Sequence, residues 1–113
     1  MNSEDFEVWR GNSYRMAGWH FPFALDGSDI VLTIRWGGGE IIRSLVAGGL
    51  EIADAEIDGA TVPVVYWTPT VAESRSIPAG RIARYEVERR VPDGEHRTYV
   101  QGYVVGVGGV NSD

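Results

Sequence analysis

Apolar and polar residues alternate over several short segments of this sequence, most regularly between Asp29 and Trp36. One face of that segment would carry Ile30, Leu32, Ile34 and Trp36, and the other Val31, Thr33 and Arg35. Successive side chains of a β-strand point to opposite faces, so a period of two predicts a strand with one buried face. Three glycines, Gly37–Gly39, then predict a turn, and Glu40–Leu45 an antiparallel return.

A second hairpin is predicted near the end of the chain. Arg81–Val91 and Arg97–Val107 are long runs that flank Pro92-Asp93-Gly94-Glu95, a strong turn signal. In the first run the apolar residues Ala83, Tyr85, Val87 and Val91 alternate with Arg84, Glu86, Glu88 and Arg90. We expect the charged residues of this face to form ion pairs across strands rather than a pair of catalytic carboxylates.

The middle of the chain predicts two more strands and one short helix. Leu50–Ile57 and Thr61–Thr68 lie on either side of an Asp58-Gly59 turn, and Pro63 favours an edge position or a strand start. Thr70-Val71-Ala72-Glu73 fits a capping box, in which Thr70 and Glu73 satisfy each other's backbone amides at a helix start. Pro78 and Gly80 follow closely, so the helix is a short turn near residues 70–76.

The N-terminal segment predicts another hairpin. Phe6–Arg10 and Ser13–Trp19 would be its strands, because Gly11-Asn12 can supply the positive φ angles of a tight turn. His20–Asp29 would then connect it to the next strand.

These elements define one all-β domain over residues 1–113, with residues 108–113 as a tail. Seven or eight antiparallel strands with half-polar faces must fold into two layers, and an immunoglobulin-like β-sandwich is the solution for 113 residues. The sequence has no cysteine, so neither disulfides nor thiolate metal sites are available. The glycines of residues 106–109 are expected to begin a flexible tail.

Charge and hydropathy argue against two kinds of partner. The net charge is −6, and all ten basic residues are Arg. Nucleic-acid binding draws on Lys and Arg, so we expect no nucleic-acid partner. No apolar run approaches the roughly 20 residues that span a bilayer, so we expect no membrane partner.

Candidate catalytic and metal-binding groups are sparse. A nucleophilic triad needs Ser, His and Asp, and the residue types are present in Ser28, His20 and Asp26. No Gly-x-Ser-x-Gly motif surrounds the serine to support such a triad. We expect His20 to be partly buried with a backbone partner and His96 to be exposed in its hairpin. Asp54–Gly59 begins like a calcium loop, yet its twelfth position is Val65 instead of Glu. We therefore predict no catalytic residue, no metal and no cofactor.

Four tryptophans, Trp9, Trp19, Trp36 and Trp67, could pack in the core or form a sugar-binding platform. Core packing is the favoured interpretation. Trp9 or Trp19, if exposed, would favour a protein interface, since Trp and Arg dominate interface hot spots.

The order of these signals resembles small β-sandwich proteins of tailed bacteriophages, typified by the N-terminal domain of upper baseplate proteins. The segments that carry the resemblance are Trp9–Tyr14, Phe23–Val31, Thr70–Glu73, Ile77–Gly80, Tyr85–Glu88 and Asp93-Gly94 with Thr98, Val100, Gly102, Val104 and Val107. Asn12 stands where the family usually has an acid, and Ser28-Asp29 where it has a small residue and Thr. Upper baseplate proteins continue into segments that hold receptor-binding proteins, whereas this sequence ends at Asp113.

The resemblance implies a non-enzymatic structural component of a phage virion, assembled in the host cytoplasm. Its partners would be other virion proteins of the tail, baseplate, fibre or capsid, and it would be oligomeric in the assembly. A tail or baseplate adaptor is the first expectation; capsid decoration and a carbohydrate-binding module are the alternatives. The first hairpin and the tail are the expected contact elements, with the candidate interface residues Trp9, Arg10, Asn12, Tyr14, Trp19, Val110 and Asn111.

Overall fold

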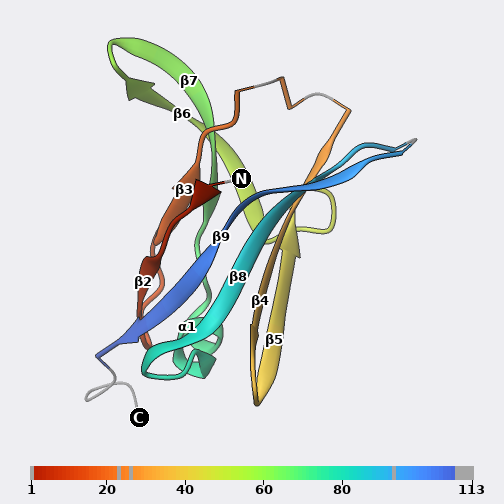
Figure 1. The fold of residues 1–113 in the computed structure, drawn as a ribbon. Coiled ribbons are helices and arrows are strands. Elements are labelled where there is room, and N and C mark those ends of the chain that lie inside the picture. Colours follow the sequence, from red (N-terminus) through yellow and green to blue (C-terminus); the bar gives the residue numbers. More distant parts are fainter. Residues whose placement is uncertain (1, 23, 26, 93, 109–113) are drawn as a thin grey trace.

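A computed structural model of the protein describes residues 2–22, 24–25, 27–92 and 94–108, which form two β-sheets and one short helix (Figure 1). The elements are β1 (Asn2–Ser3), β2 (Phe6–Trp9), β3 (Ala17–Trp19), β4 (Asp29–Trp36), β5 (Gly39–Ser44), β6 (Leu50–Ile57), β7 (Ala60–Trp67), α1 (Val71–Ser76), β8 (Gly80–Arg90) and β9 (His96–Val107). The larger, six-stranded sheet has the order β1-β9-β8-β4-β5, with β2 also paired to β9, and the smaller has the order β3-β7-β6. The prediction of an all-β sandwich is confirmed.

The long strands lie where alternation predicts them. β4 pairs antiparallel with β5 on one side and β8 on the other, and β8 pairs antiparallel with β9. Ile30, Leu32 and Ile34 are fully buried, as are Ala83 and Val87 on the neighbouring β8. One face of the curled sheet therefore forms the core, and the other faces solvent.

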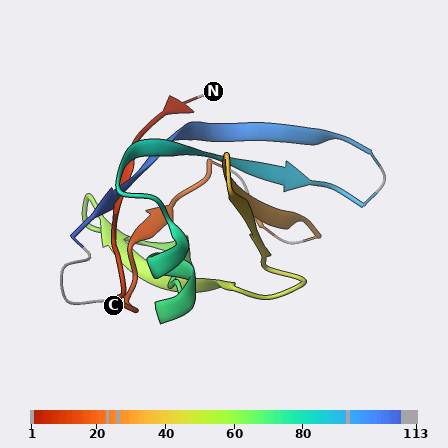
Figure 2. The same cartoon turned by 90° about the horizontal axis from the view of Figure 1, so that it is seen from below.

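The smaller sheet covers that core, as the view from below shows (Figure 2). Trp67 and Val65 from β7 are fully buried, and Trp19 from β3 is nearly so. Phe6 joins the sheets, because its ring meets Tyr85 edge-on at 4.7 Å and Trp67 at 6.1 Å between centroids. Edge-to-face pairs of this kind add to the stabilisation that burial provides.

The predicted N-terminal hairpin is wrong. β2 pairs in parallel with β9 of the larger sheet, and β3 pairs antiparallel with β7 of the smaller one. The chain does turn at Gly11, where φ is +85°, but it crosses between the sheets there instead of folding back on itself. This route lets Phe6 and Trp19 contribute to one core from opposite layers. β1 and β2 each pair in parallel with β9, so the larger sheet is mixed rather than purely antiparallel.

Glycine at position 102 permits the close approach of the N-terminal strands. A Cβ there would lie 1.9 Å from the backbone oxygen of Glu4. The backbone N–H of Tyr103 donates to Asp5 Oδ1 at 2.9 Å, and Arg81 Nε donates to Asp5 Oδ2 at 3.1 Å. These two contacts hold the pKa of the Asp5 carboxyl below its ordinary value, the backbone hydrogen bond having the larger effect. Asp5 thereby fixes the point at which β1 passes into β2.

The distal part of the β6–β7 hairpin projects from the body of the protein (Figure 1). β6 and β7 share eight residue pairs, but β3 covers only Val65–Trp67 of β7. Beyond that, residues 53–64, here called the arm, form a two-stranded ribbon. Pro63 lies in the arm, where β7 has a neighbour on the β6 side alone, so its missing N–H breaks no second ladder. The prediction of an edge position for Pro63 is confirmed in this local sense.

The helix α1 begins as the sequence predicts. Glu73 N donates to Thr70 Oγ1 at 3.1 Å and Thr70 N donates to Glu73 Oε1 at 2.9 Å, which completes the capping box. Ile77, which follows the helix, is fully buried and anchors it to the core. Within the described part of the chain, no helix is long and apolar enough to cross a membrane.

The predicted flexible glycine segment is partly wrong. Gly106 and Val107 belong to β9 and pair with β8 and β2. Gly106 lies against the backbone of Pro78, where a Cβ would come within 2.1 Å of the carbonyl oxygen. Its lack of a side chain serves close packing rather than mobility. Gly109 lies outside the described residues.

Candidate functional site

The loop between β2 and β3 is fixed to α1 by a buried serine. Ser74 has no exposed surface, and its hydroxyl donates to Asn12 O at 2.7 Å and accepts from Gly11 N at 3.0 Å. Two backbone groups of the loop are thus satisfied by one side chain of the helix. Because leaving such groups unpaired costs about 1–3 kcal/mol each, these hydrogen bonds stabilise the observed conformation of the loop.

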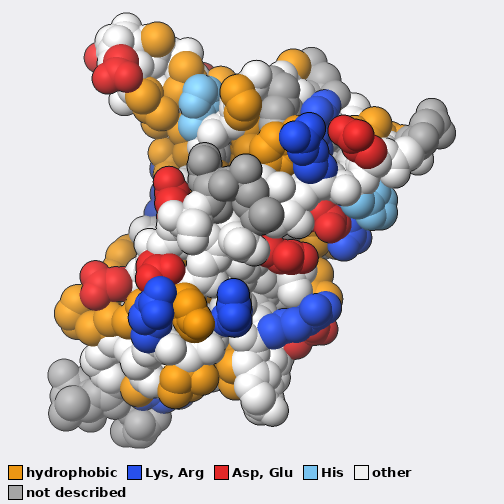
Figure 3. All heavy atoms as spheres, viewed as in Figure 1, with side chains coloured by type: hydrophobic (Ala, Val, Ile, Leu, Met, Phe, Trp, Pro, Cys, Tyr) orange, Lys and Arg blue, Asp and Glu red, His pale blue; other side chains and the backbone are white. Residues whose placement is uncertain are grey.

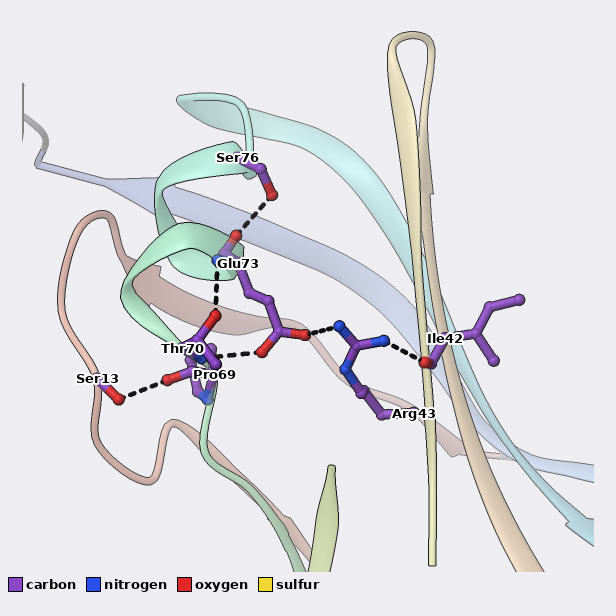
Figure 4. Close-up of polar contacts among 7 residues, drawn as sticks. All are labelled: Ser13, Ile42, Arg43, Pro69, Thr70, Glu73 and Ser76. Atoms are coloured by element: carbon purple, nitrogen blue, oxygen red, sulfur yellow. Dashed lines mark hydrogen bonds and ion pairs between the residues drawn. The ribbon is translucent and has the colours of Figure 1, made fainter. Parts of the chain in front are cut away.

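Arg10 and Ser13 add further anchors at the two ends of the helix. Arg10 Nε donates to Ile77 O at 2.8 Å, and a second nitrogen reaches Arg75 O at 3.3 Å. Ser13 Oγ donates to Pro69 O at 2.7 Å, just before the helix starts (Figure 4). Carbonyl groups at the end of a helix lack hydrogen-bond donors within the helix. The Arg10 guanidinium donates to two such carbonyls, those of Arg75 and Ile77. Arg10 therefore has a structural role in this position.

Glu73 connects the same helix to the edge of the larger sheet. One carboxylate oxygen completes the capping box and the other forms an ion pair with Arg43 of β5 (Figure 4). Arg43 also donates from Nη1 to the carbonyl of Ile42 at 2.6 Å. The helix is consequently fixed both to the loop and to β5.

Two large aromatic side chains are exposed beside this anchored loop. Trp9 is 44% exposed at the end of β2, and Tyr14 is 47% exposed within the loop. Asn12 is exposed between them in sequence. We call Trp9, Asn12 and Tyr14 the aromatic loop surface. Three of the predicted interface residues are thus exposed at the end of β2 and in the loop that follows it.

The other predicted interface residues are placed differently. Trp19 is 5% exposed and belongs to the core, because β3 faces its side chain toward Phe6 and Tyr85. It offers no surface to a partner. Val110 and Asn111 lie outside the described residues.

The predicted environment of His20 is wrong. The ring is exposed rather than partly buried, because it follows β3 on the outward face of the smaller sheet. Ser28 Oγ instead accepts from Arg89 Nε at 2.9 Å, and Asp26 lies outside the described residues. The set of Ser28, His20 and Asp26 therefore gains no support from the contacts observed.

The structure brings a different histidine near Ser28. His96, exposed as predicted, lines a hollow of about 400 Å³ together with Ser28 and Asp29. Asp29 Oδ1 accepts from Val46 N at 3.1 Å, and His96 Nδ1 lies 4.0 Å from Glu88 Oε1. Among the described residues no hydrogen bond joins His96 to Ser28, so Ser28 and His96 do not form a nucleophile–base pair. No local sequence signal could have placed His96 there, since the hollow lies between separate loops.

The tryptophans do not form a shared sugar platform. Trp19 and Trp67 are buried, while Trp36 is half-buried at the end of β4 and Trp9 is exposed on β2. β9 and β8 lie between β2 and β4, so these two strands are about 14 Å apart at the ladder spacing. That is too far for neighbouring rings to stack on one sugar.

The acidic residues are placed by strand geometry. Glu88 pairs with Arg90 along β8, not across strands as predicted, whereas Arg35 and Glu40 do pair across β4 and β5. The calcium-like segment begins at Asp54 and continues along β6 as far as Ile57. Within the ranges described, no group of three His, Cys, Asp or Glu is arranged to hold a metal ion.

No protein-family model, curated protein or solved structure matches this chain.

Proposed function

We propose that the protein is a non-enzymatic structural adaptor of a tailed-phage particle, in the tail or baseplate, which binds another virion protein through the aromatic loop surface. The observation that carries this proposal is the exposure of Trp9 at the end of β2 and of Tyr14 in the following loop, which hydrogen bonds of Ser74 and Arg10 connect to α1.

Physical chemistry favours this surface as a protein-binding site. Trp and Tyr are enriched among interface residues whose truncation costs about 2 kcal/mol or more. A loop that is already ordered loses little conformational entropy on binding, so more of the contact energy appears as affinity. The anchors around Ser74 supply that order before any partner arrives.

The virion setting depends on the resemblance to upper baseplate proteins. The segments Thr70–Glu73 and Tyr85–Glu88 carry it, and the family's β-sandwich is compatible with the fold observed here. A capsid-decorating protein would use the same kind of surface and would differ in copy number.

Incorporation into particles tests the proposal. Antibodies against the chain should label purified particles of the phage that encodes it, at a few to a few dozen copies for a tail ring and hundreds for a capsid shell. The double substitution Trp9→Ser/Tyr14→Ser should reduce the incorporated copies about tenfold or more, as expected for the loss of hot spots. Val46→Ser, at a side chain that is 80% exposed elsewhere, is the matched control and should incorporate normally. Particles without the chain, or normal incorporation of the double variant, would overturn the proposal.

A further inference from the structure

The outer strand of the arm, β6, is the last strand of the smaller sheet and has one free edge. It pairs with β7 over all eight of its residues and with no other strand of that sheet, whose order is β3-β7-β6. A free strand edge presents unpaired N–H and C=O groups, to which a strand of another chain can add. Whether β6 can accept such a strand depends on which of its backbone groups point outward.

The turn at the tip of the arm fixes the hydrogen-bonding register. The Asp58-Gly59 dipeptide has φ angles of +51° and +80°, so it forms a favoured two-residue hairpin turn, which the flanking pair Ile57–Ala60 closes by hydrogen bonding. Hydrogen-bonded and non-hydrogen-bonded pairs alternate along an antiparallel ladder. Asp54–Pro63, three pairs further along, is therefore a non-hydrogen-bonded pair, and proline suits that position because it has no N–H.

Backbone groups of alternate β6 residues consequently point to the free edge. Residues in non-hydrogen-bonded pairs turn their N–H and C=O away from the partner strand. On β6 these residues include Ile52, Asp54 and Glu56. In the described part of the chain, no hydrogen bond reaches their backbone groups. An added strand can therefore bond to all three residues.

The strands that end the sheets elsewhere are short or already covered. β1, β2 and β3 have two, four and three residues. β5 is longer, but Ser44 exchanges backbone hydrogen bonds of 3.0 Å with Gly48, and Arg43 Nη1 donates to the carbonyl of Ile42. Native sheets commonly protect their long edges in ways of this kind. β6 has neither kind of protection among the described residues, so its edge is accessible.

Acidic side chains line this edge without basic ones beside them. Asp54 and Glu56 are exposed on one face of β6, and Asp58 follows in the turn. The arm contains no Lys or Arg, and none is visible on it in Figure 3, where it projects at the upper left. Within the described residues none of these three carboxylates forms an ion pair. Opposite charges at facing positions of neighbouring strands attract, so the edge favours a strand that carries Lys or Arg.

The other face of the arm is apolar. Ala53 and Ala55 of β6 lie there beside Val64 and Val62 of β7, with which they pair. A strand added to β6 would extend this face, so its residues between the basic ones should be apolar. A second copy of β6 does not meet these requirements, because it would bring its own carboxylates to an edge that is already acidic.

We propose that β6 binds an extended segment of another protein in which basic and apolar residues alternate, and that this segment becomes a fourth strand of the smaller sheet. In antiparallel orientation its basic residues face Asp54 and Glu56, and its backbone also bonds to Ile52. The arm and the aromatic loop surface lie at opposite ends of the molecule (Figure 1). β6 is therefore a second binding surface, beyond the one on which the proposed function depends.

Hydrogen exchange of single amides, followed by NMR, tests the added strand. The probe is a synthetic peptide in which Arg and Val alternate. At saturating peptide the amides of Ile52, Asp54 and Glu56 should exchange about tenfold more slowly or slower still, because hydrogen bonds protect N–H groups. The amide of Thr61, which pairs with Glu56 and points to the opposite edge of the arm, should not change.

Two matched changes separate strand addition from simple charge attraction. The same peptide N-methylated at each Arg keeps every charge but loses the N–H groups that donate to the carbonyls of Asp54 and Glu56, so it should bind about tenfold more weakly or worse. Asp54→Arg/Glu56→Arg should weaken binding of the unmethylated peptide by a similar factor. Glu7→Arg/Glu95→Arg makes the same change in net charge at exposed residues outside the arm and should bind the peptide like the wild type.

The outcomes are distinct. Circular dichroism of each variant confirms that it is folded. Equal binding of the methylated peptide, unchanged exchange at the three β6 amides, or normal binding by Asp54→Arg/Glu56→Arg would overturn the inference. Dimerisation of the wild-type chain alone that the same variant abolishes, measured by sedimentation velocity, would also overturn it, since the occupant would then be a second copy.

The two proposals fail separately. Trp9→Ser/Tyr14→Ser leaves β6 intact and should bind the peptide normally. If the peptide does not bind while this double variant still lowers particle incorporation, the added strand is removed and the adaptor proposal remains in place.

Discussion

The two long hairpins of this protein, β8–β9 and β6–β7, both contain strands with alternating residues, but they differ in the strands and layers that surround them. In β8 the alternate residues Ala83, Tyr85 and Val87 are all buried, because β4 and β9 flank the strand and the smaller sheet covers it. In the arm, exposure increases toward the tip, where Ile57 is 41% exposed, since each strand has one neighbour there. Alternation thus determines that a segment is a strand, but its neighbours determine whether the apolar face is buried.

The arm is amphipathic even though the body covers it only at its base, where Val64 is buried. One of its faces carries Asp54 and Glu56, and the other carries only the cross-strand pairs Ala53–Val64, Ala55–Val62 and Ile57–Ala60. A two-stranded ribbon is marginally stable in water without a covering layer. The arm therefore depends on the body at its base and is suited to gain stability from a partner.

The largest expected effect separates the two regions by stability. Leu32→Ala should lower the free energy of unfolding by about 3 kcal/mol, because Leu32 is fully buried and the substitution leaves a cavity. The matched apolar truncation in the arm, Ile57→Ala, should change it by less than about 0.5 kcal/mol. Urea denaturation of both variants measures the difference, and equal losses would contradict the distinction between body and arm.

A smaller effect concerns pH and again belongs to the body. Burial, together with the charges of Glu4 and Asp5, raises the pKa of Tyr85 from 10.0 to about 12. In the unfolded chain the phenol ionises near pH 10, so this contribution to stability is complete below pH 10 and is lost as the pH rises toward 12. Two pKa units at 1.36 kcal/mol each correspond to about 3 kcal/mol in all, of which about 2 kcal/mol is lost by pH 12.

Tyr85→Phe isolates that contribution. At pH 8 the variant should be about 1 kcal/mol less stable, since it lacks the hydrogen bond from Tyr85 Oη to Glu4 O at 2.7 Å. Between pH 10 and 12 its stability should fall less steeply than that of the wild type. Parallel stability curves for the two proteins would show that Tyr85 titrates without perturbation.

The smallest effect is expected from removing the arm itself. Replacing residues 54–63 by an Asn-Gly turn joins the partners Ala53 and Val64 through a favoured two-residue hairpin loop. The free energy of unfolding should change by about 0.5 kcal/mol or less, because the deleted side chains contribute little to the core. Calorimetry measures the change. A loss comparable to that of Leu32→Ala would show that the arm stabilises the body.

Local signals were sufficient to predict much of the fold. The period of two located β4 and β8, the Asp58-Gly59 turn located the hairpin tip, and the Thr70–Glu73 capping box located the start of α1. Each depends on residues a few positions apart, so the sequence contains the whole signal.

The positions of the N-terminal strands and of the site could not be predicted in this way. Gly11-Asn12 is compatible with a hairpin and with a crossing between sheets, and the choice depends on the free edge of β9, far along the chain. Trp9 and Trp19 have similar neighbours in sequence, yet Trp9 is exposed and Trp19 is buried. The difference again depends on strand pairing, because Trp9 lies in β2 of the larger sheet and Trp19 in β3 of the smaller one. Ser74, which orders the loop of the candidate site, carries no recognisable motif because its partners are backbone groups more than 60 residues away.

The pairing of β2 with β9 sets the order of events during synthesis. Asp5 and Tyr103, which meet at this junction, are separated by 98 residues. β2 has no partner strand in the larger sheet until β9 has left the ribosome, so the sandwich closes only after β9 has been translated. Contacts between such distant residues slow folding. Until β9 arrives, β2 lacks its partner strand, and unpaired strand edges of this kind favour pairing with other chains.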